Sequence, residues 1–283
     1  MSRNEVFSFY EIVPELEPLT IVDVGASISA NRTGYQALVD AGHATVIGFE
    51  PNPQAYAQLT AQAGKGRRTY PHFIGDGAPG TYHETNNFLT GSLFPVNVPV
   101  VSRFTNLMQM TTPVAEHPVT THRLDDVVTD AEIDFLKMDV QGAELAVMKG
   151  APRLLATTLL IETEVEFIPL YKGQPLFADV DTFMRGAGFQ IHALPTLMRY
   201  YYTPMEDRAK PLTGLHQVVF SDAVYFPNFD RVMSLPRMRI LKLVALLHDL
   251  YRSVDLALHL LQRLKERDGD APFEAYARRL GFM

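Results

Sequence analysis

The chain has 283 residues, 47% of them apolar, and carries a formal net charge of -7 at pH 7. This apolar content is enough for a sizeable core, whereas the negative charge argues against a broad nucleic-acid-binding surface. The sequence contains no cysteine, which excludes disulfides, thiolate metal ligands and cysteine nucleophiles. The first residues lack the basic start and apolar core of a signal peptide, and no apolar run reaches the roughly 18 residues of a membrane span. We therefore expect a cytoplasmic protein without a membrane span.

Predicted strands and helices alternate in the first part of the chain. Three short runs rich in β-branched and aromatic residues have the character of buried strands, and helical stretches follow the first two. The strands are expected at residues 20–26, 44–50 and 69–76, and the helices at about 33–41 and 54–62. Such alternation predicts an α/β fold with a parallel sheet.

Residues 77–118 differ from the segments around them. They are rich in Gly, Pro, Asn and Thr, and their periodicity is weak. We expect an insertion of loops with a hairpin, which forms either a lid or binding loop or a loose decoration of the sheet edge. Strand patterns then resume at 133–139, 158–167 and 214–226, and a helix closed by Gly186-Ala187-Gly188 is followed by a further strand.

The segment from 236 to 265 is strongly apolar. Two sets of residues recur every seven positions, as in a coiled-coil seam: Ile240, Leu247, Val254 and Leu261, and Leu243, Leu250, Ala257 and Leu264. Further leucines widen the apolar stripe beyond a seam, which favours one or two helices packed on the parent domain. A helix that forms a homodimer is the alternative. We accordingly divide the chain into a main domain at 1–230 and a C-terminal helical extension at 231–283.

Acidic residues collect where the predicted strands end, in Asp23-Val24-Gly25-Ala26, Glu50-Pro51-Asn52, Gly75-Asp76 and Asp139-Val140-Gln141-Gly142. In an open parallel sheet, ligands bind beyond these carboxyl ends. Gly25 allows the backbone to approach a ligand closely. Glu50 stands at the end of the second strand, where an acid is suited to accept hydrogen bonds from a ribose diol.

The glycine pattern distinguishes between possible nucleotides. The segment after Asp23 is not G-x-G-x-x-G, because Ser27 and Ser29 stand where further glycines would hold a pyrophosphate, and this argues against NAD or FAD. The sequence also lacks G-x-x-x-x-G-K-[ST], so a P-loop is not supported. A nucleoside ligand without a pyrophosphate needs less backbone clearance, and S-adenosylmethionine is such a ligand.

The chain resembles the FkbM-type methyltransferases, which use S-adenosylmethionine on a class I methyltransferase fold. Four stretches between about residues 20 and 194 carry the resemblance: IVDVGA, VIGFEPNPQAYAQL, HRLDDVVTDAEIDFLKMDVQGAELAVMKGA and EVEFIPLYKGQPLFADVDTFMRGAGFQIHAL. The third is the most specific, because it joins Leu-Asp-Asp to Lys-x-Asp-x-(Glu/Gln)-Gly-Ala-Glu. The resemblance implies a Rossmann-like, doubly wound, mostly parallel sheet for the main domain.

The resemblance also implies roles for particular residues. Asp23, Gly25 and Ala26 line the methionine end of the cofactor, and Glu50 holds the ribose hydroxyls. Asp76 lies near adenine and Asp139 beside the reacting methyl. Neighbouring residues complete the predicted cofactor site: Ser27, Pro51, Asn52 and Gln141. Two positions depart from the family pattern, because Ser27 and Ser29 replace the usual Asn and Gly, and Gln141 stands where Glu is frequent.

Methyl transfer to a hydroxyl requires an aligned oxygen and a group that takes its proton. Asp139 is the first candidate for this base, and binding of the cofactor's amino group is its alternative role. Glu164 and His122 are further catalytic candidates, and His216 is another possible base. Glu144 is either a second acid of the site or a residue that favours the start of a helix through the macrodipole.

Three glutamates alternate along one predicted strand and share a face of it: Glu162, Glu164 and Glu166. They line either a substrate pocket or an exposed edge. With Asp139 and a histidine, two of them could hold a divalent cation, but nothing in the spacing requires one, and we assign no metal.

The sequence thus predicts an S-adenosylmethionine-dependent O-methyltransferase. Its acceptor is expected to be a hydroxyl of a small molecule, either a sugar or glycan or a natural product, and nucleic acid is not an expected partner. An NAD-dependent nucleotide-sugar oxidoreductase and a non-catalytic binding module on the same fold are the alternatives.

Overall fold

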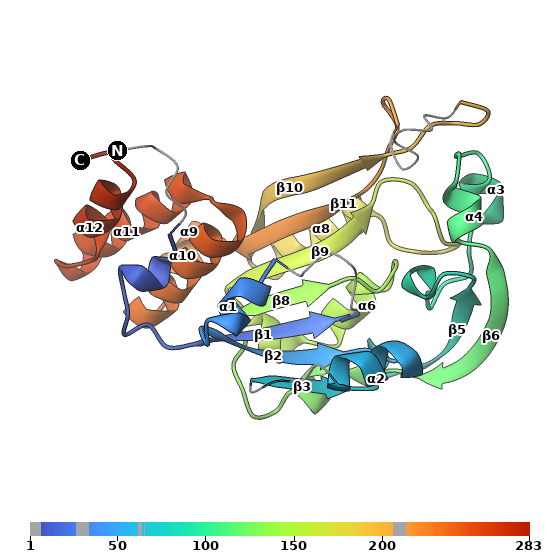
Figure 1. Ribbon diagram of the computed structural model, residues 1–283, viewed down its shortest axis with the longest axis horizontal. Coiled ribbons are helices and arrows are strands. Elements are labelled where there is room, and N and C mark those ends of the chain that lie inside the picture. The colour runs from blue at the N-terminus through green and yellow to red at the C-terminus, as the bar shows by residue number, and fades with distance from the viewer. Residues whose placement is uncertain (1–6, 27–33, 62–63, 65, 206–213) are drawn as a thin grey trace.

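A seven-stranded sheet forms the centre of the protein in a computed structural model that describes residues 7–26, 34–61, 64, 66–205 and 214–283 (Figure 1). The strand order is β10-β11-β9-β8-β1-β2-β3. All pairs are parallel except those of β11, which runs antiparallel to β9 and β10. The strands are β1 Leu19–Val24, β2 Ala44–Phe49, β3 Arg67–Tyr70, β8 Phe135–Met138, β9 Leu160–Glu166, β10 Phe189–Arg199 and β11 Val218–Pro227. The predicted doubly wound, mostly parallel α/β fold is confirmed.

Helices cover both faces of this sheet. One hydrophobic cluster lies between the sheet and a group of four helices, which are α5 Leu124–Val127, α6 Glu144–Lys149, α7 Pro152–Leu155 and α8 Phe177–Gly186. The cluster on the other face includes residues of η1 Phe9–Glu11, α1 Gln36–Asp40 and the C-terminal helices. The helix α2 Pro53–Ala61 packs beside β3. The inner strands β1 and β2 are buried on both faces, and their sequences are correspondingly almost all apolar.

The third predicted strand is broken into two pieces. β3 ends at Tyr70, and the next short strand, β4 Ile74–Gly75, leaves the central sheet to pair with β7 His122–Arg123. Pro71 lies between them and explains the break. It has no backbone N–H for a further hydrogen bond to the neighbouring strand, and it restricts the backbone conformation of the residue before it. The prediction of one strand over 69–76 was therefore wrong.

The expected hairpin is present in the insertion. β5 Pro79–Thr85 and β6 Pro113–Thr120 pair in antiparallel fashion. Between them lie η2 Phe88–Thr90, α3 Val98–Val101 and α4 Leu107–Met110, whose apolar residues join a small core of their own. The parallel strands point toward this insertion in Figure 1, so it lies at the carboxyl end of the sheet.

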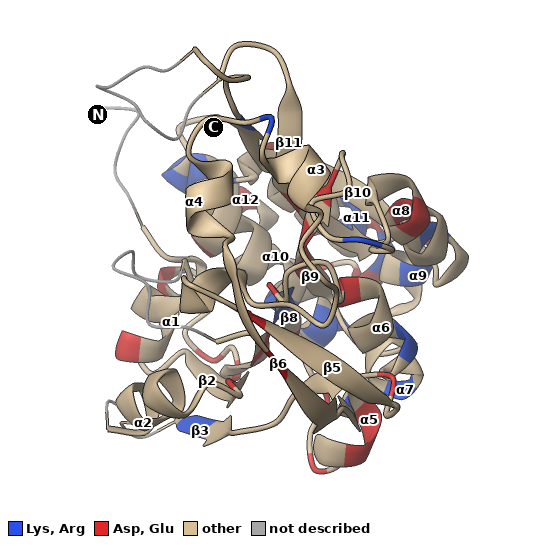
Figure 2. Cartoon of the chain, turned by 90° about the vertical axis from the view of Figure 1, so that its right-hand side faces the viewer, with Lys and Arg blue, Asp and Glu red and all other residues tan. Residues whose placement is uncertain are grey.

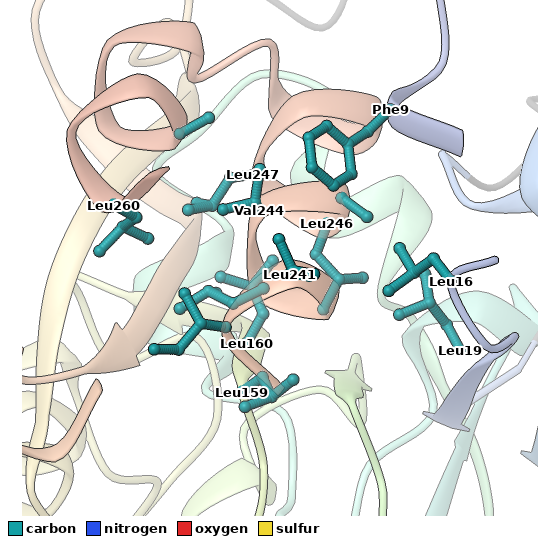
Figure 3. Close-up of a cluster of buried hydrophobic side chains, with 14 of the residues drawn as sticks. Phe9, Leu16, Leu19, Leu159, Leu160, Leu241, Val244, Leu246, Leu247 and Leu260 are labelled. Atoms are coloured by element: carbon teal, nitrogen blue, oxygen red, sulfur yellow. The ribbon is translucent and has the colours of Figure 1, made fainter. Parts of the chain in front are cut away.

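The C-terminal segment forms four helices, α9 Phe229–Ser234, α10 Arg237–Tyr251, α11 Val254–Asp268 and α12 Phe273–Arg279. Arg252, in the left-handed conformation with φ 53°, ends α10 and divides the predicted heptad pattern between α10 and α11. The apolar residues of α10 face the sheet and the N-terminal segment, where Leu241, Val244 and Leu247 pack near Leu160 and Leu19 (Figure 3). This arrangement matches the expectation of helices packed on the parent domain.

The shared core bears on two further expectations. Residues from both sides of position 231 belong to one hydrophobic cluster, and the division into a main domain and an extension stays a prediction. No helix in the described ranges is both long enough and apolar enough to cross a membrane.

Candidate active site

A cavity of about 440 Å³ opens beyond the ends of β1, β2 and β8. It lies at the switch point between β1 and β8, from which the strand order runs outward in both directions, and ligands bind at this point in open α/β sheets. Figure 2 looks onto this end of the molecule and shows acidic segments between β2, β8 and β9. The lining includes predicted residues from three strand ends: Asp23, Gly25, Glu50, Pro51, Asn52, Asp139 and Gln141.

Gly25 forms the turn at the end of β1. Its φ is +82°, and a Cβ at this position would lie 1.9 Å from the carbonyl oxygen of Asp139. The two chain segments are joined there because the Asp139 N–H donates to the Val24 carbonyl at 3.0 Å. Only glycine tolerates both this backbone conformation and this closeness, so the turn after β1 lies directly against the turn after β8.

Asp23 is a buried carboxylate at the base of the cavity, with 2% of its surface exposed. Its Oδ2 accepts a hydrogen bond from the Tyr35 hydroxyl, and its Oδ1 lies 3.9 Å from the Lys137 ammonium. Oδ1 accepts no hydrogen bond from any residue that the structure describes. A buried carboxylate oxygen without a donor is costly unless a ligand supplies one.

Glu50 follows β2 and is 7% exposed. One oxygen, Oε1, accepts the backbone N–H of Asn52 at 2.7 Å, which fixes the side chain across the turn. Burial raises the pKa of Glu50 to about 7; the hydrogen bond from Asn52 opposes this shift, and the charges of Asp23 and Asp139 add to it. The carboxyl group is therefore close to half protonated at neutral pH.

Asp139 stands beyond the end of β8 and is linked to a hydrogen-bond network behind it. The amide nitrogen of Gln141 donates to Asp139 Oδ1 and to Glu164 Oε1, both at 2.9 Å. The Gln141 amide oxygen accepts the Tyr171 hydroxyl at 2.8 Å. Glu164 thus lies behind Gln141, is not part of the cavity lining, and communicates with Asp139 through the amide.

The remaining acids of this region are buried under the turn. Glu144 is 2% exposed and accepts the Val140 N–H at 2.8 Å, so it holds the turn that leads into α6. Burial, with the neighbouring acids, raises the pKa values of Glu144 and Glu164 well above the usual range. For Glu166 the same causes raise the pKa to about 7. β9, which carries Glu162, Glu164 and Glu166, lies between β8 and β11. The alternative that these three glutamates occupy an exposed sheet edge is therefore wrong.

The far wall of the cavity carries an ionic group, of which the sequence predicted Glu162 as a possible pocket residue but neither Lys137 nor Asp222. Lys137 is the register partner of Asp23 on one side and of Glu162 on the other, so the three side chains share a face of the sheet. Asp222, from the antiparallel β11, also lines this wall. Burial lowers the pKa of Lys137, but the surrounding carboxylates outweigh it and the net shift is upward. The Tyr251 hydroxyl donates to Glu162 at 2.5 Å.

Aromatic and apolar residues form the rest of the wall, and the sequence did not predict them either. His72, Phe73 and Ile74 line the side next to Glu50, where the chain leaves β3. The hairpin insertion supplies the rim: Tyr82, Phe88, Leu89, Gly91, Ser92 and Leu93. Two of the rim side chains are largely exposed, Phe88 at 52% and Leu89 at 41%.

Several predicted residues lie elsewhere. Asp76 is exposed and accepts the Ala78 N–H at 3.0 Å, because the break after Tyr70 moves it away from the end of the third sheet strand. His122 is exposed outside the lining, with its ring 4.4 Å from that of His72, and His216 is exposed on a loop before β11. Ala26 is buried directly after Gly25, and Ser27 lies outside the described residues. No group of three or more histidine or acidic side chains in the described ranges has the arrangement of a metal site.

Comparisons with known proteins point to one enzyme class. The sequence model of the Methyltransferase FkbM domain matches residues 23–191, more than half of the chain. The 2-O-methyltransferase NoeI of Sinorhizobium fredii (strain NBRC 101917 / NGR234) is 46% identical over 67 residues, which cover 22% of this chain and only 28% of that relative.

Two solved structures show weaker similarity. A putative methyltransferase from Thermoplasma acidophilum is 12% identical with a TM-score of 0.39, covering 76% of this chain and 70% of its own. Precorrin-6y C5,15-methyltransferase from Geobacter metallireducens GS-15 is 8% identical with a TM-score of 0.35, covering 78% and 87%.

Proposed function

The chain belongs to the FkbM methyltransferase family, whose methyl donor is S-adenosylmethionine, and from this premise we propose that it methylates a hydroxyl group of a sugar, glycan or natural product. Family membership decides for methyl transfer over NAD-dependent nucleotide-sugar oxidation and over a non-catalytic module. The acceptor and the catalytic residues are our proposal, and the position of Asp139 in the cavity lining, beyond the end of β8, carries it.

The residues next to β1 and β2 fit the donor. Asp23 Oδ1 is a buried acceptor that receives no hydrogen bond from the described residues, which suits the cationic amino group of the methionine end. The turn at Gly25 leaves room only for backbone, and Glu50 is placed to accept ribose hydroxyls. Pro51, Asn52, His72 and Phe73 extend the wall on the side expected for adenine. When bound, S-adenosylmethionine supplies a methyl group activated by its sulfonium charge.

Asp139 is our candidate for the general base. It borders both the donor half of the cavity and the half lined by Lys137, Glu162 and Asp222. An acceptor hydroxyl is a poor nucleophile, so a carboxylate that receives its proton contributes typically 10²–10⁴-fold. Ionised Asp139 would take that proton, and the walls of the cavity would hold the hydroxyl oxygen in line.

The second half of the cavity supports a polar, uncharged or cationic acceptor. Carboxylates and the Lys137 ammonium offer hydrogen-bond partners to hydroxyls, and Tyr82 and Phe88 offer apolar surface to a ring. Of the charged lining groups, five are acidic and one is a lysine, which disfavours phosphorylated acceptors and nucleic acid. The partial match to a 2-O-methyltransferase agrees with oxygen as the acceptor atom.

The proposal is tested with Asp139→Asn. We expect its affinity for S-adenosylhomocysteine, which keeps the amino group but lacks the sulfonium charge, to stay within a fewfold of the wild type when measured by calorimetry. Single-turnover methyl transfer to acceptors found in a panel of saccharides and hydroxylated natural products should fall by about 10²–10⁴. Glu116→Gln, on the exposed hairpin, is the control and should leave both values unchanged.

Two results would contradict these assignments. If the whole defect of Asp139→Asn is lost donor affinity, the residue is a ligand of the donor's amino group and not the base. If the wild type methylates only nitrogen, sulfur or nucleic-acid acceptors, the proposal of O-methylation fails.

Cytoplasmic location and a homodimer formed through the C-terminal helices stay predictions. Most of the heptad residues, including Ile240, Leu243 and Leu247, are fully buried within the chain itself. Analytical ultracentrifugation of the intact protein over a wide concentration range measures whether it self-associates.

A further inference from the structure

Gln141 occupies a position between two carboxylates that the proposed reaction does not explain. Its side-chain nitrogen has two hydrogens, and two oxygens accept them, Asp139 Oδ1 and Glu164 Oε1, each at 2.9 Å. The orientation of the amide follows from chemistry, because ionised carboxylates only accept hydrogen bonds and the Tyr171 hydroxyl can donate to the amide oxygen. The amide therefore bridges the end of β8 to the middle of β9.

Gln141 is itself held by several contacts. Its amide oxygen accepts the hydroxyl of Tyr171, a residue that is 2% exposed, and the Ser92 hydroxyl donates to its backbone carbonyl at 2.6 Å. The backbone φ of Gln141 is +56°, a conformation that residues other than glycine rarely adopt. Gln141 thus combines a strained backbone conformation with one hydrogen bond to its side-chain amide and one to its backbone carbonyl, which is typical of a functional position.

We propose that Gln141 is a positioning residue, whose amide holds the Asp139 carboxylate in one orientation so that it can act on the acceptor. This inference rests on the proposed function of Asp139. Both ends of the amide are committed to protein partners, so Gln141 acts through Asp139 and not on the substrate.

The need for such a donor follows from the charges around Asp139. Acids face it from every neighbouring element: Asp23 of β1, Glu50 after β2, Glu144 of α6, Glu164 and Glu166 of β9, and Asp222 of β11. Lys137 is the cation on this side, and the Tyr171 hydroxyl completes the surroundings. Like charges repel one another, so these acids favour movement of the Asp139 carboxylate away from its present position. The Gln141 amide donates to Asp139 and to Glu164 and so opposes that movement.

The charge on Asp139 can be measured without knowing the acceptor. S-adenosylmethionine and S-adenosylhomocysteine differ by one methyl group and by the positive charge on sulfur. The ratio of their affinities therefore reports the negative charge near the sulfur atom. Protonation of Glu50 affects the ribose contacts of both ligands alike and cancels in the ratio. We would measure this ratio by calorimetry from pH 6 to pH 9.

The near-isosteric Gln141→Met removes both donors and retains the bulk of the side chain. We expect its preference for S-adenosylmethionine to fall roughly tenfold, the effect of one hydrogen bond to a charged group, because the Asp139 carboxylate is no longer held beside the sulfur. Tyr171→Phe should produce a smaller fall, because it removes the hydrogen bond that orients the Gln141 amide.

The outcomes separate the two hypotheses. Asp139→Asn should give a low ratio, and an unchanged ratio would show that Asp139 is not near the sulfur, so that the proposed function fails. If Asp139→Asn behaves as expected but Gln141→Met keeps the wild-type ratio, even with both ligands bound more weakly, Gln141 is only structural. If Gln141→Met does not fold, Tyr171→Phe decides, and a wild-type ratio in that variant overturns the inference.

Discussion

At the scale of single residues, strand ends were predictable and the residues brought in from elsewhere were not. Asp23, Gly25, Glu50 and Asp139 line one cavity because parallel strands deliver their carboxyl ends to the same edge of a sheet. Asp222 enters from the antiparallel β11, and Tyr82 from a hairpin folded across the sheet end. Their positions depend on pairings between distant segments, which no local pattern encodes.

The protonation of Glu50 should control donor binding. Burial raises its pKa to about 7, and the ionised form is the better acceptor for ribose hydroxyls. We therefore expect the affinity for S-adenosylhomocysteine, measured by calorimetry, to fall as the pH drops below about 7. Glu50→Gln should bind roughly tenfold more weakly at pH 8, since a hydrogen bond to a charged group contributes about 1.5–3 kcal/mol, and its affinity should not vary between pH 6 and 8.

Asp76→Asn is the matched control, because the Asp76 carboxylate lies outside the cavity lining. It should bind like the wild type at each pH. A Glu50→Gln protein with wild-type affinity at pH 8 would remove Glu50 from the ribose site, and weaker binding by Asp76→Asn would restore that residue to the adenine side.

At the scale of elements, local signals such as glycine stops predicted where helices end. A periodic apolar pattern did not predict whether one helix continues or two helices form. The helix α8 ends at Gly186, within the predicted Gly-Ala-Gly stop, whereas the effect of Pro71 on the third strand was overlooked. The heptad pattern continued through Arg252, but the chain turns there and the two halves of the pattern pack within one molecule. A seven-residue repeat describes an apolar stripe equally well whether its partner is another chain or its own sheet.

Leu247 tests whether the apolar stripe of α10 packs within the chain or against a second copy of it. It is fully buried on α10, so Leu247→Ala should lower the free energy of unfolding by about 2–5 kcal/mol. Urea unfolding followed by circular dichroism at two protein concentrations, tenfold apart, measures the loss. The midpoint should be the same at both concentrations if the residue packs within the chain. Gln262→Ala, exposed on α11, should change stability by no more than about 0.5 kcal/mol.

A midpoint that rises with concentration in the wild type but not in Leu247→Ala would instead place this residue in an interface between two copies. The cluster around Leu247 joins β1, β9 and the N-terminal segment (Figure 3), so we expect the first result.

At the scale of the whole molecule, the net charge of -7 is unevenly distributed. Composition indicates an acidic protein but not where the acids lie, and several of them converge on the carboxyl end of one sheet (Figure 2). Glu50, Glu144 and Glu166 are each less than 9% exposed. Burying carboxylates near one another opposes their ionisation, so the cluster lowers the free energy of unfolding. A stable fold could be built without this cluster, which makes it a property of function and not of the fold class.

The cost of this arrangement should appear as a pH dependence of stability that Glu166 carries in part. Burial, with the nearby charge of Asp139, raises the pKa of Glu166 to about 7 in the folded state, against about 4.3 in an unfolded chain. Between these two values the folded state binds more protons than the unfolded state, so stability falls as the pH rises through this window and stays low above it.

Glu166→Gln removes the charge while keeping the shape. It should therefore be more stable than the wild type at pH 8, by on the order of 3–4 kcal/mol since one pKa unit corresponds to about 1.36 kcal/mol, and nearly equal to it at pH 4.5. Thermal unfolding of the ligand-free protein at a series of pH values measures the difference between variant and wild type, in which the titration of all other groups largely cancels. Glu116→Gln, with a side chain 71% exposed, should show no such gain at pH 8. A Glu166→Gln protein whose advantage is the same at both pH values would mean that packing, and not the buried charge, limits stability at this end of the sheet.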